Sequence, residues 1–251
     1  MKLSIVIPAY NEGDSIPEIL RDLYNTLSAK NIPHELLVVN DNSKDQTQSV
    51  LDGLKTEIPT LRSVFNAGPN GFGLAVRKGL ENTDGDVVAI VMADGSDSPE
   101  DVAKFYQKIL EGYDCVFGSR FMAGSEVVGY PHLKLFLNRI FNLMVRTLFG
   151  FRYNDVTNAF KMYRAEVLQG VKPYLSHHFN LTVELPLKAI IRGYSYTVLP
   201  NSWRNRKHGK SNLKIKEMGS RYLFIMIYCF IEKWLAAKDY SKDKATGGPR
   251  G

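Results

Sequence analysis

Carboxylate side chains follow three separate apolar runs in the first hundred residues. The runs at residues 3–7, 36–39 and 87–91 lead into Glu12, Asp41 and Asp94, respectively. Continuous Val/Ile/Leu runs bounded by turn residues are typical of strands in a parallel sheet that is covered on both faces. Ligands of such sheets bind beyond the carboxyl ends of the strands. The pattern therefore predicts a site for a polar, phosphate-bearing ligand that is held through a metal ion.

Asp94 and Asp97 are the candidate metal ligands. They lie three residues apart in a glycine-containing loop, and two such carboxylates can share one Mg²⁺ or Mn²⁺ whose remaining ligands are water and phosphate oxygens. The metal would neutralise a diphosphate leaving group. Asp97 has a second interpretation, because it precedes a helix that is predicted to begin at Pro99, and acidic residues favour helix N-termini.

Other residues near the predicted strand ends are candidates for binding a nucleotide or a phosphate. Glu12 and Asp41 can accept hydrogen bonds from a ribose or a base, or they can simply close local turns. Arg120 follows a fourth apolar run, and Arg206 belongs to a basic loop. Arginine binds phosphate through two parallel hydrogen bonds, so both are candidate phosphate ligands. The basic loop can also be only a solvated segment.

The order of elements predicts the fold class. Apolar runs alternate with amphipathic helical segments through short joints, which predicts an α/β domain whose mostly parallel sheet has helices on both faces. We expect this domain to span residues 1–213. Residues 239–251 have the composition of a disordered tail.

Two segments have broad apolar faces. Residues 133–149 are apolar except at five basic or amide positions and at Thr147. Residues 214–238 combine leading lysines with a ten-residue apolar stretch and amphipathic aromatic side chains. Such helices fit a membrane interface, and they also fit a buried core position or, for the second, a contact with another subunit. The ten-residue stretch is too short to span a bilayer.

Composition restricts the class of partner. The net charge is +6, but residues 201–251 contain 12 basic and 4 acidic residues. A basic end suggests an anionic partner such as lipid headgroups or a substrate phosphate, or it keeps a solvated tail soluble. We see no nucleic-acid-binding motif. Two cysteines without metal-like spacing and the absence of a signal peptide predict a cytoplasmic location.

Seven motifs in order resemble the inverting family 2 glycosyltransferases, and in particular their polyprenyl-phosphate (dolichol-phosphate mannosyltransferase-like) branch. The motifs are IVIPAYNE at 5–12, VVNDNSKDQT at 38–47, NGFGLAVRKGL at 70–80, DGDVVAIVMADGSDSPE at 84–100, FGSRF at 117–121, DVTNAFKMY at 155–163 and RKHGKSNL at 206–213.

The resemblance implies a GT-A fold, a nucleotide-diphosphate sugar donor and a divalent metal. By motif position, Pro8, Tyr10, Glu12 and Asp41 would hold the nucleotide. Asp94 would be the metal carboxylate, and Arg120 and Arg206 would face phosphates. The chain departs from the family pattern at Met92, Asn40, Asn158-Ala159 and Asn212, which bears on metal geometry and donor choice.

We therefore expect an inverting transfer of one sugar to a polyprenyl or dolichyl-type lipid phosphate at the cytoplasmic face of a membrane. Lys134, Arg139 and Arg120 would receive the acceptor phosphate. Because a phosphomonoester is largely dianionic near neutral pH, it needs no general base.

Two alternatives stay open. The same fold can act on a sugar hydroxyl, with Asp155 or Glu184 as the base. The chain can also be a catalytically degenerate sugar-nucleotide-binding protein, because Met92 and Asn40 replace carboxylates of the family pattern. Oligomerisation is compatible with either.

Overall fold

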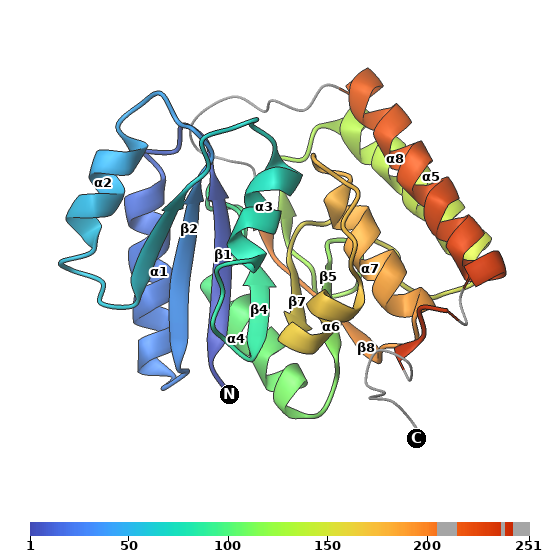
Figure 1. Cartoon of the computed structure of the whole chain (residues 1–251), viewed down its shortest axis with the longest axis horizontal. Helices are drawn as coiled ribbons and strands as arrows, with labels where there is room; N and C mark the ends of the chain where they lie inside the picture. The colour runs from blue at the N-terminus through green and yellow to red at the C-terminus, as the bar shows by residue number, and fades with distance from the viewer. Residues whose placement is uncertain (205–214, 237–238, 243–251) are drawn as a thin grey trace.

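A seven-stranded sheet forms the centre of the molecule (Figure 1). The computed structural model describes residues 1–204, 215–236 and 239–242. The strands lie in the order β3-β2-β1-β4-β7-β5-β8, and every strand except β7 is parallel to the others. Their bounds are β1 Leu3–Ala9, β2 His34–Asn40, β3 Leu61–Phe65, β4 Val87–Ile90, β5 Cys115–Ser119, β7 Lys161–Arg164 and β8 Tyr196–Pro200. The predicted mostly parallel α/β fold is confirmed.

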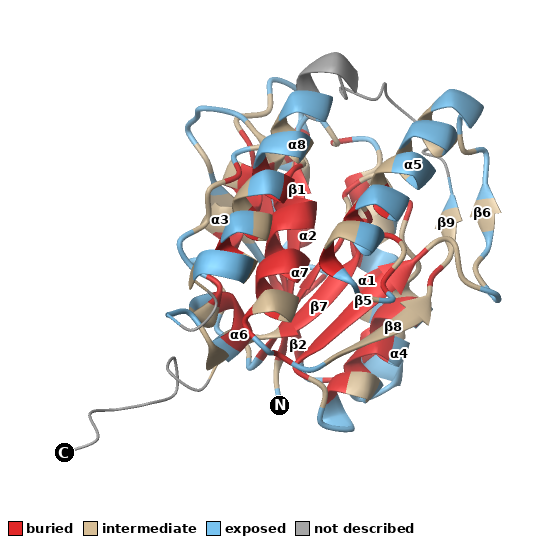
Figure 2. Cartoon of the chain, turned by 90° about the vertical axis from the view of Figure 1, so that its right-hand side faces the viewer, coloured by how far each residue is buried: buried red, intermediate tan, exposed pale blue. Residues whose placement is uncertain are grey.

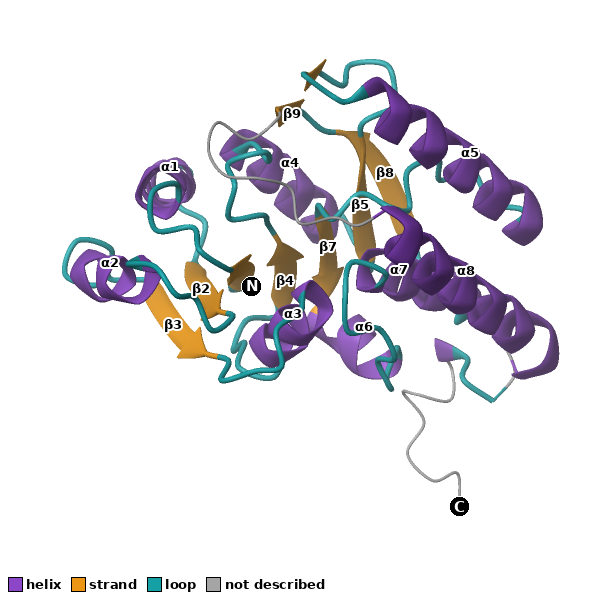
Figure 3. Ribbon diagram, turned by 90° about the horizontal axis from the view of Figure 1, so that it is seen from above, coloured by secondary structure: helices purple, strands orange, loops and turns teal. Residues whose placement is uncertain are grey.

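Helices cover both faces of this sheet (Figure 3). One face carries α1 Ile16–Ala29, α2 Thr47–Leu54 and α4 Pro99–Leu110; the other carries α3 Phe72–Leu80, α6 Ala165–Gly170 and α7 Leu181–Ile191. In β1, Ile5 and Ile7 belong to the core under α1, whereas Val6 belongs to the core under α3. Alternate side chains of a strand point to opposite faces, so a continuous apolar run fills both cores.

Two further helices, α5 and α8, lie side by side at one end of the molecule (Figure 1). α5 spans His132–Phe149, and α8 spans Ile215–Ile231 and continues into the π-helical turn η1, Glu232–Ala236. α5 thus covers the predicted helix at 133–149. Within the described residues, no helix is both long enough and apolar enough to cross a bilayer.

The inner sides of these two helices complete the core, but their outer sides are apolar and exposed (Figure 2). The large exposed apolar side chains of α5 are Leu133, Phe136, Leu137, Ile140, Leu143 and Met144; those of α8 and η1 are Leu223, Phe224, Ile227, Ile231, Trp234 and Leu235. We call these twelve side chains the outer apolar face. They form two adjacent rows, whereas apolar residues scattered singly over a surface are ordinary.

A short two-stranded sheet lies beside the main sheet. It pairs β6 Val127–Val128 with β9 Trp203–Arg204. β9 follows the edge strand β8, and β6 precedes α5. This small sheet therefore connects the edge of the main sheet to the N-terminal end of α5.

Part of the segment that we expected to be disordered contacts the body. The Lys242 ammonium lies 2.8 Å from Asp114 Oδ2, and the Lys242 amide donates to the carbonyl of Arg192. Residues 243–251 lie outside the described residues, and there the expectation stays a prediction.

A buried ion pair joins α7 to the end of α8. Arg192 Nε and Nη2 donate to the two carboxylate oxygens of Glu232 at 2.7 and 3.1 Å, and Arg192 Nη1 also donates to the carbonyls of Gly170 and Lys172. Both side chains are nearly inaccessible. The pair therefore fixes where α8 ends.

Arg192→Met should lower the free energy of unfolding by roughly 3–5 kcal/mol, because it leaves a buried carboxylate without its partner. Urea denaturation measures this loss. Adding Glu232→Leu should recover part of it. Arg21→Met, which removes the exposed pair with Glu57, is the matched control and should change little. Equal effects of Arg192→Met and Arg21→Met would contradict the structural role of the pair.

Candidate functional site

The loops that follow β1, β2 and β4 lie at one edge of the sheet. β1 is the neighbour of both β2 and β4, and all three strands are parallel, so Glu12, Asp41 and Asp94 emerge at the same edge. The Ser15 hydroxyl lies 2.8 Å from Glu12 Oε2 and 3.0 Å from the carbonyl oxygen of Ala93. The first and third loops therefore contact each other directly.

Hydrogen bonds also join the first loop to the second. The amides of Asn11, Glu12 and Gly13 donate to the side-chain oxygens of Ser43, Thr47 and Asp45, respectively. Asn40, which departs from the family pattern, accepts a hydrogen bond from the Ser43 amide and donates to Gln48. Asn40 thus shapes this loop. Pro8 is buried inside β1, whereas Tyr10 is 40% exposed beside the loops.

Asp41 is a buried acceptor at the end of β2. Its two carboxylate oxygens accept hydrogen bonds from Asn66 Nδ2 at 2.6 Å and from the Gly71 amide at 2.8 Å. Burial raises the pKa of the Asp41 carboxyl, although these two donors oppose the rise. Gly71 has to be a glycine, because a Cβ atom there would lie 2.5 Å from the carbonyl oxygen of His177. The carboxylate keeps further lone pairs for donors of a ligand.

Asp94 and Asp97 line a shared cavity. Asp97 Oδ2 accepts a hydrogen bond from the Met92 amide at 3.0 Å, and Asp94 Oδ1 accepts one from the Ser96 amide at 3.1 Å. No side-chain hydrogen bond caps the N-terminus of helix α4. The carboxylate of Asp97 instead closes the 92–97 loop through the Met92 amide. Burial raises the pKa of Asp97 to about 7, and the charge of Asp94 adds to the rise.

These two carboxylates fit a divalent cation. Within the described residues, no group of three or more His, Cys, Asp or Glu side chains converges on one point. Mg²⁺ is commonly held by one or two carboxylates together with substrate phosphates. A cation next to Asp94 and Asp97 would also remove the repulsion between the two carboxylates. The pair therefore suits a metal that arrives with a phosphate ligand.

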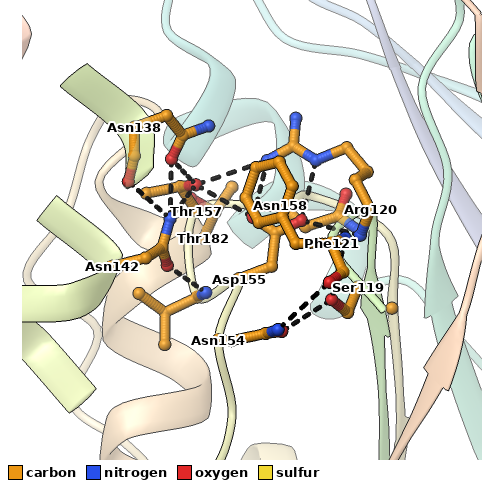
Figure 4. A network of polar contacts seen from close by, with 12 residues as sticks. Ser119, Arg120, Phe121, Asn138, Asn142, Asn154, Asp155, Thr157, Asn158 and Thr182 are labelled. Carbon is orange, nitrogen blue, oxygen red and sulfur yellow. Dashed lines mark hydrogen bonds and ion pairs between the residues drawn. The ribbon is translucent and has the colours of Figure 1, made fainter. Parts of the chain in front are cut away.

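Arg120 is held by a buried carboxylate (Figure 4). Its Nε and Nη2 donate to the two oxygens of Asp155 at 2.8 and 2.7 Å, and its Nη1 lies 3.4 Å from the hydroxyl of Tyr130. Asp155 is fully buried, and Arg120 occupies both of its carboxylate oxygens. Glu184, the other candidate base, is also fully buried and paired with Lys188 at 2.6 Å.

A polar network surrounds this ion pair (Figure 4). The Thr157 hydroxyl hydrogen-bonds Asn138 of α5, and Asn142 of α5 donates to Thr157 and accepts from the Val156 amide. The turn at 155–158 thus connects β5, through Arg120, with α5. Helix α5 contributes its polar stripe to the site and keeps its apolar stripe outside.

A cavity of about 350 Å³ lies between this network and the helix pair. Its polar lining comprises Asp94, Ser96, Asp97, Arg120, Lys134, Asn138, Thr157 and Asn158. Its apolar and aromatic lining comprises Met92, Tyr130, Leu137, Phe141, Ala159, Phe179, Trp203 and Tyr222. The cavity is therefore lined by both charged and apolar side chains.

The structure brings together some of the predicted phosphate ligands and separates others. Arg120 and Lys134 line the cavity, but Arg139 is not among its lining residues, and its guanidinium lies 4.7 Å from the ring centre of Phe121. Arg206 lies outside the described residues. Sequence reasoning missed Asn138, although Lys134, Asn138 and Asn142 recur every four residues and so share one helix side.

Comparisons with known proteins assign the sequence to a known family. Residues 4–171 match the family described as Glycosyl transferase family 2. A polyprenol monophosphomannose synthase of Mycolicibacterium smegmatis is 28% identical over 83% of this chain and 80% of its own length. A dolichol-phosphate mannosyltransferase of Pyrococcus furiosus is 29% identical over 86% of this chain, and the match spans only 60% of that relative.

Solved structures share the fold. Glucosyl-3-phosphoglycerate synthase from Mycobacterium tuberculosis, crystallised with Mn²⁺, UDP-glucose and phosphoglyceric acid, aligns with a TM-score of 0.70 and 18% identity over 92% of this chain and 79% of that chain. The same synthase in complex with Mg²⁺ and UDP gives a TM-score of 0.67. At this identity the likeness concerns the fold alone.

Asp97→Asn should stabilise the metal-free protein in a pH-dependent manner. The folded-state pKa of Asp97 is raised to about 7, so wild-type stability falls as pH rises from about 4 to 7, whereas the amide does not titrate. The stability gain of the variant should grow over this range and level off above pH 7, with a limit of ~4 kcal/mol. Asp52→Asn, at an exposed carboxylate on α2, is the control.

Thermal melts in the presence of a chelator, at several pH values between 4 and 8, measure this gain. A pH-independent difference between wild type and Asp97→Asn would show that the Asp97 carboxyl titrates normally in the folded protein.

Proposed function

The chain belongs to glycosyl transferase family 2, and we propose that it moves one sugar, with inversion, from a nucleotide-diphosphate donor to the phosphate of a polyprenyl or dolichyl-type lipid. The observation that carries this proposal is the single cavity that runs from Asp94 and Asp97 past Arg120 and Lys134 to the helix pair. A lipid phosphate has the same division into a charged head and an apolar chain.

The apolar end of the cavity supports a lipid acceptor. Phe141 of α5 and Tyr222 of α8 line the cavity with their ring centres 5.4 Å apart. Leu137 lines the cavity and is also 40% exposed on the outer apolar face. An alkyl chain can therefore pass from the cavity to that face without leaving apolar contact, whereas an oligosaccharide would find few hydrogen-bond partners there.

The charged end supports a phosphate acceptor in place of a hydroxyl. A sugar hydroxyl needs a carboxylate base, but Asp155 is bound to Arg120, and Glu184 is bound to Lys188. A phosphomonoester, whose second pKa is ~6, attacks without one. It has to approach the donor diphosphate against charge repulsion, and Arg120 and Lys134 reduce that repulsion.

The reaction then follows from the positions of these residues. Arg120 and Lys134 orient the acceptor phosphate, one oxygen of which bonds to the anomeric carbon from the side opposite the nucleoside diphosphate. The bond between that carbon and the diphosphate oxygen breaks, and the diphosphate leaves with the electron pair. Asp94 and Asp97 would hold the Mg²⁺ or Mn²⁺ that neutralises this leaving group.

The donor side is built from the loops after β1 and β2. In the proposal, Asp41 accepts hydrogen bonds from the base, and Tyr10 and Glu12 contact the rest of the nucleotide. Arg206 is proposed to face phosphates as well, although it lies outside the described residues. Because two relatives are named for mannose, mannose is the first donor sugar to test.

We also propose that the outer apolar face rests on the membrane that carries the acceptor. Phe136 and Phe224 are 62% and 61% exposed on neighbouring helices. Arg139 of α5 is exposed, and anionic headgroups attract such cations. Two free buried cysteines fit the cytoplasmic side. The chain would then attach peripherally through these helices.

Purified full-length protein with Mn²⁺ should transfer sugar to a polyprenyl phosphate, and Asp94→Asn should reduce the rate at least ~100-fold because the metal carboxylate is lost. Radiolabelled nucleotide-sugars of several bases and sugars, followed by extraction into organic solvent, measure the product. Asp52→Asn, at an exposed carboxylate on α2, is the matched control. Transfer only to oligosaccharides would refute the lipid acceptor, and donor binding without transfer to any acceptor would favour a binding protein.

Phe136→Ser combined with Phe224→Ser should weaken binding to vesicles that contain anionic phospholipid by roughly tenfold or more, since each Phe contributes ~1.5–3 kcal/mol of apolar burial. Vesicle flotation measures it. Phe65→Ser, at a Phe that is 53% exposed on β3, is the control. If vesicle binding is unchanged while light scattering shows loss of a dimer, the face is a subunit interface.

A further inference from the structure

A buried carboxylate outside the cavity holds one of its walls. Asp101 lies in the first turn of α4 and is only 3% exposed. Its Oδ2 accepts a hydrogen bond at 2.8 Å from the amide of Ser202, which is 101 positions later in the sequence. Its Oδ1 pairs with Lys104, whose side chain is 67% exposed. Burying a carboxylate is costly unless it is hydrogen-bonded. The hydrogen bond from the Ser202 amide therefore offsets part of this cost.

Ser202 begins the segment that separates two cavities. Trp203 lines the cavity described above, whereas Ser202 and Arg204 line a second cavity of about 650 Å³ on the side of α1 and α4. Side chains alternate in direction along an extended segment. The Trp203 amide donates to the carbonyl of Glu126, and the Arg204 amide donates to the carbonyl of Ser96 in the loop of Asp94.

Trp203 contacts Tyr130, which in turn contacts the basic side chains of Arg120 and Lys134 in the cavity. Its ring lies 4.9 Å from the ring of Tyr130, measured between centres. The Tyr130 hydroxyl lies 3.4 Å from Arg120 Nη1 and accepts a hydrogen bond from Asn138 at 2.8 Å, and Lys134 Nζ lies 5.8 Å from the Tyr130 ring centre. A displaced Trp203 would therefore disturb Tyr130, and with it the two cations.

We propose that Asp101 is a positioning residue for the acceptor phosphate. Through the Ser202 amide it fixes Trp203, Trp203 fixes Tyr130, and Tyr130 sets the direction of Arg120 and Lys134. The inference rests on the proposed function for the identity of the acceptor. The loops after β1 and β2 do not contain this segment, but its Arg204 amide binds the carbonyl of Ser96 in the loop of Asp94. Displacement of the segment should therefore weaken acceptor binding most and affect the donor side to a smaller extent, through the metal loop.

The chain offers a matched control in Asp114. This carboxylate is also buried, at 5% exposure, and its Oδ2 accepts a hydrogen bond at 2.8 Å from the amide of Ser195. Ser195 immediately precedes β8, whereas Ser202 follows its other end. Both aspartates therefore anchor the same strand, but only Asp101 anchors the end that lines the cavity.

The kinetic test compares Asp101→Ala, Asp101→Asn and Asp114→Ala. Asp101→Ala should raise the KM for polyprenyl phosphate roughly tenfold, with the donor KM changed less than ~2-fold. Asp101→Asn should restore most of the affinity, because its amide oxygen accepts the Ser202 N–H. Asp114→Ala should lose comparable stability with an unchanged acceptor KM. Lys104→Ala tests whether the exposed ion pair matters, and it should resemble wild type.

A second readout is independent of the reaction. Trp203 and Trp234 are the two tryptophans, so in a Trp234→Phe background the fluorescence reports Trp203 alone. Asp101→Ala should increase acrylamide quenching of this fluorescence at least ~2-fold by exposing the ring, and Asp114→Ala should not. Unchanged quenching, or an acceptor KM that rises equally in the Asp114 variant, overturns the inference. Failure of wild type to use polyprenyl phosphate, with quenching as expected, refutes the proposed acceptor alone.

Discussion

The site depends on holding like charges together at one edge of a parallel sheet. Glu12, Asp41 and Asp94 emerge from neighbouring strands because β2, β1 and β4 are adjacent and parallel. Within the third of these loops, Asp94 and Asp97 repel one another, and this repulsion adds to the burial that raises the pKa of Asp97. Backbone amides and hydroxyl groups hold the loops in spite of it. A divalent cation that arrives with a diphosphate removes the repulsion, so the same arrangement that costs stability prepares the edge for its ligand.

The opposite wall of the cavity has the complementary charge. Arg120 is held by Asp155, and Lys161 lies beneath the turn at 155–158, where it donates to the carbonyls of Val156 and Asn158. Burial lowers the pKa of Lys161 to about 7. Arg120 and Lys134 line the cavity and favour an anionic ligand, and the apolar lining includes Leu137, which is also exposed on the outer apolar face. Acidic, basic and apolar side chains thus line one cavity.

Much of the fold could be predicted because a strand that is buried on both faces has a continuous apolar sequence, as at Leu3–Ile7. Strand β7 could not be predicted, because its end residues Lys161 and Arg164 are charged and resemble loop residues. The Lys161 ammonium donates to carbonyls of the turn at 155–158, and this partner is evident only in the folded chain. The carboxylates after the strands were predicted from local order. The role of Asp155 was not, since its partner Arg120 is 35 residues away, and the contact between Asp101 and Ser202 has no sequence pattern at all.

The most direct test of this account is a thermal melt of the full chain with nucleoside diphosphates, each with and without Mn²⁺. If the loops after β1, β2 and β4 form one donor site that closes around a metal, the nucleotide and Mn²⁺ together should raise the Tm by more than the sum of their separate effects, and Asp94→Asn should abolish the excess. A shift that is the same with and without Mn²⁺, or that persists in Asp94→Asn, would contradict a donor site assembled through the metal.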